Sequence, residues 1–303
     1  MAIKEFIIIN APSNLGLIEP APGIEPGVKF LPGKILDTGF AKSLGVKIIL
    51  NIDPPPYTMH VDEETKIRNA HAIREYSTKL GTEIAQHVSK EKFQIVLGGD
   101  CSILIGCMLG LKTKGSYGLF YMDGHTDYML PEHSGTAGAA GMDLALVSGN
   151  GPQLLSNIES HSPYVLEEDI YCYGNREYET WYVDLVEQSN IHYFDLESIR
   201  AKGIAAITQN FLDSIIAKKL EGFWIHLDVD VLDDALMPCV DSRTPDGLTY
   251  EELSATLIPL ISSPLARGIN ITILDPTLDP ENTYLRTFCD KMLKIFNEDI
   301  LQE

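Results

Sequence analysis

Two short runs of the sequence place carboxylates and an imidazole at alternate positions. The first contains Asp123, His125 and Asp127, and the second, much later in the chain, contains Asp228 and Asp230. Each run follows or continues a short apolar segment with the composition of a buried strand. In an extended chain, residues i and i+2 point to the same side. Two such strand ends lying side by side would gather four carboxylates and a histidine in one cleft.

This combination of side chains indicates a metal site. Carboxylates packed so closely repel each other unless a cation lies among them. A single Asp-x-His-x-Asp run is more often a solvated turn, but two runs at the ends of separate strands favour metal binding. Oxygen-rich ligand sets with one or two imidazoles suit manganese, and also zinc, cobalt, iron or nickel.

A third strand-like segment ends in Gly98-Gly99-Asp100-Cys101-Ser102. The two glycines would let the backbone approach a neighbour closely. Asp100, Cys101 and Ser102 are expected to point into the same cleft. Alone, Gly-Gly-Asp indicates a turn, and it gains weight here as the third strand end of one kind.

Eight apolar runs separated by helical patterns must position these residues. The runs are near-continuous, as expected for strands covered on both faces. The predicted strands are Phe6–Asn10, Val46–Asn51, Gln94–Leu97, Tyr117–Met122, Ile170–Tyr173, Ile191–Phe194, Phe223–Leu227 and Ile269–Leu274. The predicted helices are Glu63–Lys90, Ser102–Lys112, Tyr178–Gln188, Ile204–Lys219 and Tyr250–Ser262.

The alternation of strands and helices predicts an α/β fold, a three-layer α/β/α arrangement around a mainly parallel sheet. Functional groups in such folds collect at the carboxyl ends of the strands, where all three motifs lie. Asp62 and Thr249 are predicted helix N-caps, and Glu252 lies at the capping-box spacing from Thr249. No composition shift divides the chain, so we expect residues 1–303 to form a single domain.

Composition excludes several classes of partner. The chain has 303 residues, 45% of them hydrophobic, and a formal charge of −20. This charge argues against nucleic acid, whose phosphates need clustered Lys and Arg. No apolar run approaches the length of a signal core or a membrane span, so no membrane partner is expected. Five cysteines without a CxxC pair indicate reduced thiols and a cytoplasmic location.

The order of the three motifs resembles the ureohydrolase family of arginases, agmatinases and formimidoylglutamases, whose fold is shared with deacetylases. The similarity covers nearly the whole chain. Further segments that resemble family motifs are Asn10–Leu17 with Gly23–Gly27, Gly174-Asn175-Arg176, and Thr244–Thr249.

The resemblance implies a centre of two Mn²⁺ ions that holds a bridging hydroxide, which attacks the amidine carbon of a guanidino or formimino substrate. Asp123 and Asp228 would bridge the ions. Asp127 would complete the shell of one ion and take a catalytic part, whereas His125 and Asp230 would bind the other. Asp233 is expected to support these ligands from behind.

Cys101 stands where the family has a metal-binding histidine. A thiolate can bind zinc, cobalt, iron or manganese, but it shifts the preference away from manganese. Three interpretations stay open at this stage. Cys101 is a metal ligand, a bystander beside a weakened or empty first site, or a nucleophile, since thiols near metals ionise easily.

The end of the last strand also departs from the family. Arginases and agmatinases carry a glutamate there that accepts hydrogen bonds from the guanidinium, and this chain has Ile273. Losing a buried carboxylate partner should cost on the order of 2–5 kcal/mol of binding. Plain arginine is therefore not the expected substrate unless Asp275, two residues on, takes both a catalytic and a substrate-binding role.

The loop after the first acidic run shows the third departure. Where the family often has His-Gly, this chain has Ala140-Gly141. His133 in the same loop is a candidate for proton transfer, with an exposed loop histidine as the alternative. Ser134 and Glu179 are candidate substrate-binding residues.

His226 precedes Asp228 on the same strand face, where it either supports the metal ligands or belongs to the core. The leading functional prediction is a metal-dependent hydrolase of a linear amidine, with two Mn²⁺ ions per chain, or one ion, or Zn²⁺, Ni²⁺ or Co²⁺. The alternatives are a mononuclear zinc amidohydrolase using Asp123, His125 and Asp230, and a non-catalytic binding or regulatory protein. The expected partners are a small amidine or amide substrate and further copies of the chain, as a trimer or hexamer.

Overall fold

The computed structural model describes residues 5–177 and 179–298. Its described strands form one eight-stranded sheet in the order β2-β1-β3-β8-β7-β4-β5-β6, and every neighbouring pair is parallel. The strands are β1 (Glu5–Asn10), β2 (Ile48–Asn51), β3 (Lys92–Leu97), β4 (Tyr117–Met122), β5 (Ile170–Asn175), β6 (His192–Asp195), β7 (Gly222–Asp228) and β8 (Ala266–Thr272). The predicted parallel sheet is confirmed.

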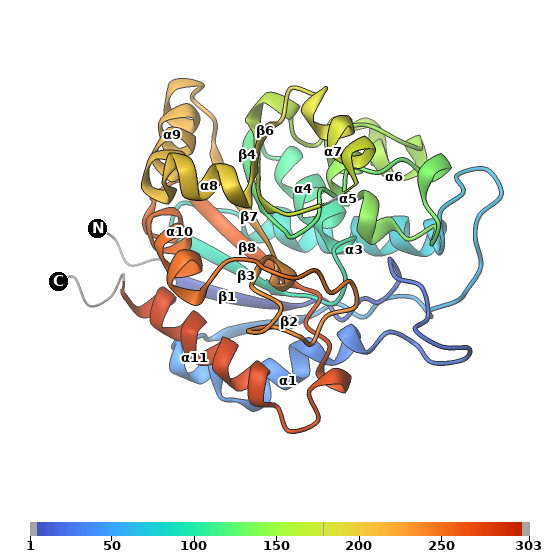
Figure 1. Cartoon of the computed structure of the whole chain (residues 1–303), viewed down its shortest axis with the longest axis horizontal. Helices are drawn as coiled ribbons and strands as arrows, with labels where there is room; N and C mark the ends of the chain where they lie inside the picture. The colour runs from blue at the N-terminus through green and yellow to red at the C-terminus, as the bar shows by residue number, and fades with distance from the viewer. Residues whose placement is uncertain (1–4, 178, 299–303) are drawn as a thin grey trace.

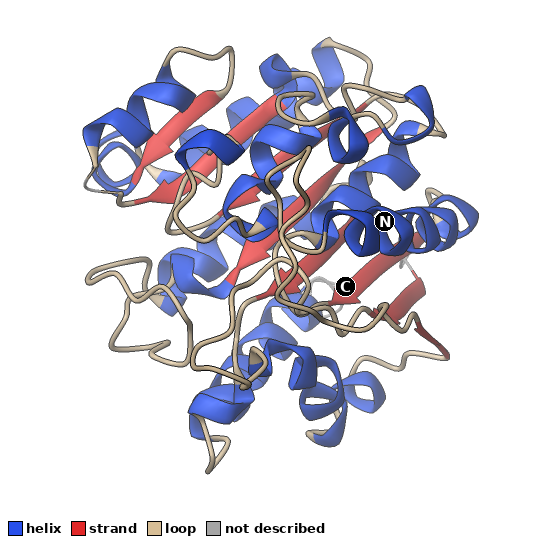
Figure 2. Cartoon of the chain, turned by 90° about the vertical axis from the view of Figure 1, so that its right-hand side faces the viewer, coloured by secondary structure: helices blue, strands red, loops and turns tan. Residues whose placement is uncertain are grey.

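Helices cover both faces of this sheet (Figures 1 and 2). One layer contains α1 (Leu31–Asp37), α2 (Phe40–Ser43), α8 (Leu196–Lys202), α9 (Ile204–Ala217), α10 (Tyr250–Ser262) and α11 (Thr283–Glu298). The other contains α3 (Ala70–His87), α4 (Ile103–Lys112), α5 (Asp143–Val147), α6 (Gln153–Ser156) and α7 (Thr180–Glu187). Short 3₁₀ turns lie at Gly27–Phe30, Pro131–His133, Ala139–Met142, Ile158–Ser160, Glu167–Asp169, Val229–Val231 and Pro276–Leu278. Among the described residues, no helix is both long and apolar enough to cross a bilayer.

The two helical layers explain why the strands read as continuous apolar runs. Ile8 of β1 packs into one core, whereas Ile7 and Ile9 pack into the other. Because side chains alternate across a strand, a sheet buried on both faces has apolar residues at most positions. The predicted three-layer α/β/α fold is confirmed.

Two of the predicted helix starts have different outcomes. Thr249 caps α10 as expected, since its hydroxyl accepts the Glu252 N–H at 3.1 Å and the Glu252 carboxylate accepts the Thr249 N–H at 2.8 Å. Asp62 does not cap a helix, because α3 begins only at Ala70. Its carboxylate instead accepts the Thr65 N–H at 2.8 Å and closes a turn.

Four adjacent strands in the middle of the sheet position the site. β3, β8, β7 and β4 are neighbours, and Leu97, Ile271, Leu227 and Met122 lie level in the register. The residues that follow these positions therefore meet at one edge of the sheet. All three predicted motifs emerge at this edge.

Candidate metal centre

The turn after β3 brings Cys101 to the centre. A side chain at Gly99 would lie 1.6 Å from the Ser13 carbonyl oxygen, so only glycine fits this close approach. The Asp100 carboxylate accepts the Ser13 hydroxyl at 2.8 Å and the Ser102 N–H at 2.9 Å. Asp100 thus braces the turn instead of pointing into the cleft as expected, and Cys101 is the residue of the motif that faces the carboxylates.

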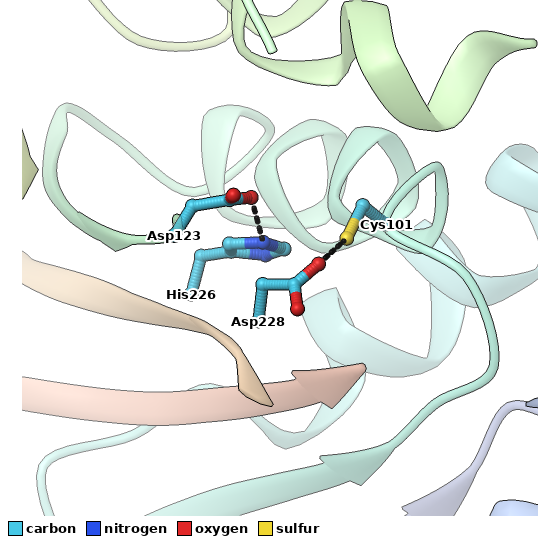
Figure 3. Close-up of side chains that lie close together, drawn as sticks. All are labelled: Cys101, Asp123, His226 and Asp228. Carbon is cyan, nitrogen blue, oxygen red and sulfur yellow. Dashed lines mark hydrogen bonds and ion pairs between the residues drawn. The ribbon is translucent and has the colours of Figure 1, made fainter. Parts of the chain in front are cut away.

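A first group of possible metal ligands consists of Cys101, Asp123, His226 and Asp228 (Figure 3). One ligand atom from each lies within 4.8 Å of all the others, and all four residues are buried. The Cys101 thiol donates to the Asp228 carboxylate at 2.8 Å and contacts the Thr272 hydroxyl at 3.2 Å. Burial and the neighbouring carboxylates raise the pKa of the Cys101 thiol well above its usual value. Without a cation, Cys101 is therefore a neutral thiol.

A second group consists of Asp123, His125 and Asp230. His125 Nδ1 lies 2.9 Å from Asp230 Oδ2 and 3.6 Å from Asp123 Oδ1. Burial lowers the pKa of His125, but the charges of Asp230 and Asp123 outweigh it and hold that pKa well above its usual value. A proton on His125 thus balances the charge of Asp230 when no metal ion is bound. Asp123 belongs to both groups, as a carboxylate shared by two ions must, whereas Asp228 belongs only to the first.

Asp127 lies beside these groups and belongs to neither. The Tyr121 hydroxyl lies 2.9 Å from Asp123 Oδ2, 2.9 Å from Asp143 Oδ1 and 3.2 Å from Asp127 Oδ2. A phenol carries one proton, so it cannot donate to three carboxylates at once. Burial and the neighbouring charge of Asp123 raise the pKa values of Asp127 and Asp143 well above the usual range. This excess of buried carboxylates fits a site that binds cations.

His226 faces this cluster from β7. Its ring stacks on Tyr121 at 4.4 Å with an interplanar angle of 7°. Nδ1 lies 2.7 Å from Asn270 Nδ2, whereas Nε2 has no hydrogen-bond partner among the described residues and lies 3.9 Å from Asp123 Oδ2. Burial lowers the pKa of His226 to about 3, so the ring is neutral. An unpartnered buried nitrogen aimed at the carboxylates further marks this as a polar centre.

Arg176 stabilises the turn that carries Asp230 of the second group. Its guanidinium is buried and donates to the carbonyl oxygens of Asp230 at 2.6 Å and Thr244 at 3.0 Å. The Gly-x-Arg motif therefore fixes the turn that carries Asp230. Asp233, which we expected to support the ligands, accepts the Ala235 N–H at 2.8 Å and closes a neighbouring turn.

A cavity of about 260 Å³ opens above the two groups. Its lining includes Cys101, His125, Asp127, Ser134, Asp230, Asp241 and Ile273 from turns and loops, Asp228 from the end of β7, and Tyr182 from α7. Ser134 thus lies where a substrate-binding residue was expected. Asp241 at the cavity was not foreseen, because it lies in an irregular loop that matches none of the motifs.

Four predicted site residues lie outside the set that lines this cavity: Asp123, which is buried beneath it, and the three described next. His133 is exposed and packs edge-on against Trp181, with the ring centroids 5.8 Å apart. Glu179 accepts a hydrogen bond from the indole of the same tryptophan. Asp275 turns away from the cleft, and its carboxylate accepts the Gly27 N–H at 3.0 Å. In this structure Asp275 therefore pins a loop to the end of the sheet and does not replace the acid that is absent at Ile273.

Comparison with known proteins places this geometry in a family. Residues 4–295 match the model of the arginase family. The chain is 27% identical over 305 residues to an arginase of Staphylococcus aureus (strain MSSA476), covering 98% of this chain and 99% of that protein. The arginase structure from Bacillus caldovelox superposes with a TM-score of 0.85 at 24% identity, covering 97% of this chain and 98% of that one. A formimidoylglutamase structure from Bacillus subtilis superposes with a TM-score of 0.72 at 22% identity, covering 98% of this chain and 87% of that one.

Proposed function

The chain belongs to the arginase family, and we propose that it is a metal-dependent hydrolase that cleaves a C–N bond of a linear amidine other than plain arginine. The observation that carries the proposal is the pair of ligand groups that share Asp123, since other members of both groups line one cavity. Two divalent cations at such a site would lower the pKa of a water molecule and neutralise charge at the carbon that it attacks.

The ligands favour different ions. His125 with Asp123 and Asp230 is a nitrogen and oxygen set that suits manganese as well as zinc. The first group includes a thiol, which favours softer ions such as Zn²⁺ or Co²⁺ over Mn²⁺. We therefore propose two ions per chain, with the first group the more selective against manganese.

The cavity wall argues against a simple guanidinium in the usual orientation. Ile273 lines the cavity and presents an apolar side chain where an acid would accept hydrogen bonds. Asp241 and Ser134 supply polar groups elsewhere on the wall. A formimino or substituted guanidino compound, with an apolar part against Ile273 and a polar part toward Asp241, fits this distribution.

Proton transfer falls to a residue that faces the cavity. His133 is exposed outside the cavity lining, whereas Asp127 lines it and contacts the buried Tyr121 hydroxyl. A carboxylate that lines the cavity can take a proton from the attacking water and return it to the leaving group. We propose that Asp127 accepts and returns the proton during hydrolysis.

A mononuclear zinc amidohydrolase is the second candidate. The observation in its favour is the hydrogen bond between Cys101 and Asp228, which holds the first group together without an ion. Asp123, His125 and Asp230 would then form the only loaded site.

Metal content and a substrate screen distinguish these functions. The protein is purified without added metal, reconstituted with Mn²⁺ or Zn²⁺, and tested by elemental analysis and with guanidino, formimino and acetylamino compounds. Two ions and amidine cleavage support the proposal, one zinc ion and deacetylation support the second candidate, and no bound metal refutes both. Asp230→Asn should abolish activity, and the exposed Glu251→Gln is the matched control. The trimer or hexamer and the cytoplasmic location stay predictions.

A further inference from the structure

A buried line of three polar side chains runs behind the first ligand group. Trp224 and His226 lie on β7, and Asn270 lies opposite His226 on β8. The Trp224 indole N–H donates to Asn270 Oδ1 at 2.8 Å, and Asn270 Nδ2 lies 2.7 Å from His226 Nδ1. All three residues are completely buried. Nothing in the proposed reaction uses this line.

The chemistry of these groups decides where the histidine carries its hydrogen. An indole nitrogen only donates, so the oxygen of the Asn270 amide must face Trp224. The amide NH₂ then faces His226 Nδ1, which must accept and therefore carries no hydrogen. Turning the amide round would place its NH₂ against the indole N–H, with two donors facing each other. The neutral ring of His226 consequently carries its hydrogen on Nε2.

We propose that Trp224 and Asn270 lock His226 as an Nε2–H donor directed at Asp123, so that His226 positions the shared carboxylate and does not bind a metal ion. Nε2 is 3.9 Å from Asp123 Oδ2 and has no hydrogen-bond partner among the described residues. Stacking on Tyr121 fixes the ring, and the Tyr121 hydroxyl contacts the same carboxylate oxygen at 2.9 Å. The Tyr121 hydroxyl and His226 Nε2 thus both face the same oxygen of Asp123.

The lock has a consequence for metal selectivity. A nitrogen that carries hydrogen has no lone pair for a metal, so the first group is left with Cys101, Asp123 and Asp228. Histidine ligands normally donate their other N–H to a carboxylate or a carbonyl, and Asn270 already offers its oxygen to Trp224. This inference rests on the proposed function, because it assumes that the centre binds metal ions. Its first test, however, is made on the metal-free protein.

Asn270→Asp is the variant that reverses the lock, because a carboxylate accepts from both neighbours. The Trp224 indole keeps its acceptor, and His226 Nδ1 gains one, so the ring hydrogen moves to Nδ1. Trp224→Phe is the second variant. It removes the indole donor and frees the Asn270 amide to turn its oxygen toward His226.

The tautomer is measured on metal-free protein with ¹⁵N-labelled histidine, by two-bond ¹H–¹⁵N correlation, with His226→Gln to assign the signal. We expect the Nε2–H pattern in the wild type, the Nδ1–H pattern in Asn270→Asp, and a shift toward Nδ1–H in Trp224→Phe. An Nδ1–H pattern in the wild type overturns the proposal. An Nε2–H pattern that is retained in both variants also overturns the proposal. If one variant does not fold, the result of the other variant decides.

Metal affinity gives the second readout. With Zn²⁺ or Co²⁺ and a competing chelator, Asn270→Asp should strengthen binding at the first group by about tenfold or more, the usual effect of a partner that orients a histidine ligand. Unchanged or weaker binding in a folded variant with the Nδ1–H pattern refutes the ligand-exclusion part of the proposal. Failure of the proposed hydrolase activity would leave the tautomer result standing, so the two are separable.

Discussion

Replacing Asp123 by asparagine should stabilise the metal-free protein at neutral pH and destabilise the metal-loaded one. Burial and the charge of Asp230 raise the pKa of Asp123 to about 6. Above that pH, the folded metal-free protein must hold an ionised carboxylate among others without a cation. Asparagine keeps the shape of the side chain. It also keeps an oxygen that can accept the backbone N–H of His125, which Asp123 Oδ1 accepts at 2.6 Å.

The size of the effect follows from the difference in pKa between the folded and unfolded states. An unfolded aspartate titrates near 3.9, so the difference is about two pKa units, at 1.36 kcal/mol per unit. Between these pH values the folded state binds more protons than the unfolded state, and stability falls as the pH rises. Asp123 should therefore cost about 3 kcal/mol of unfolding free energy above pH 6 and almost nothing below pH 4.

Urea unfolding of the wild type and Asp123→Asn, in chelator at pH 4.5 and pH 7.5, measures this cost. Because pH 4.5 already lies above the pKa of the unfolded aspartate, the stability difference between the two proteins should shift by about 2 kcal/mol in favour of asparagine at the higher pH. Saturating Zn²⁺ should reverse the order, because binding to the folded state stabilises only the protein that keeps the shared ligand. Asp290→Asn on the exposed face of α11 is the control for a lost negative charge. A stability difference that is the same at both pH values would refute the reasoning.

Three further predictions concern single residues. Cys101→Ser should weaken Zn²⁺ binding at the first group by about 10–100-fold in chelator competition, which is the loss usually seen when a residue hydrogen-bonded to a metal ligand is removed. Mn²⁺ binding should weaken by less, because manganese prefers oxygen ligands to sulfur. Equal losses for both ions would contradict a thiolate ligand. Ile273→Glu should strengthen the binding of guanidino compounds by about 2–5 kcal/mol, measured as KM or Kd, and no gain would show that this wall does not contact the amidine. Thr249→Ala should cost about 1 kcal/mol of unfolding free energy through loss of the capping box, with unchanged metal stoichiometry, and a neutral result would contradict the cap.

The sheet could be predicted because its strands are buried on both faces. Tyr117–Met122 was predicted with the bounds of β4, and the other seven strands were located to within a few residues. Helices were predicted less completely, since α1 lies in a stretch rich in Gly and Pro, and α11 was overlooked despite its amphipathic pattern. The last strand was predicted too long, because β8 ends at Thr272 and Ile273 takes a positive φ of 75°. This conformation is rare for a β-branched residue, and no sequence pattern predicts it.

Ligand candidates in the strand-end motifs could be predicted because the motifs follow neighbouring parallel strands, whose carboxyl ends meet at one edge of the sheet, although most of the ligands lie in the turns beyond the strands. Asp123, His125 and Asp230 come together in this way. Tyr121 and Asp143 could not be predicted, because their part depends on packing between elements far apart in sequence. Glu179 and Asp275 were chosen by their spacing from a motif, but loop conformation, which spacing does not determine, turns both away from the cavity.

The two ligand groups differ in what replaces the cation when none is bound. In the second group a proton on His125 balances Asp230, whereas in the first a thiol proton on Cys101 is shared with Asp228. A metal ion must displace both protons, because an imidazolium has no free lone pair and the thiolate is the form that binds metal. Affinity should therefore rise with pH at both groups. At the first group the pH range depends on a thiol whose pKa is raised by burial, so a cation that binds sulfur strongly has the advantage there over manganese.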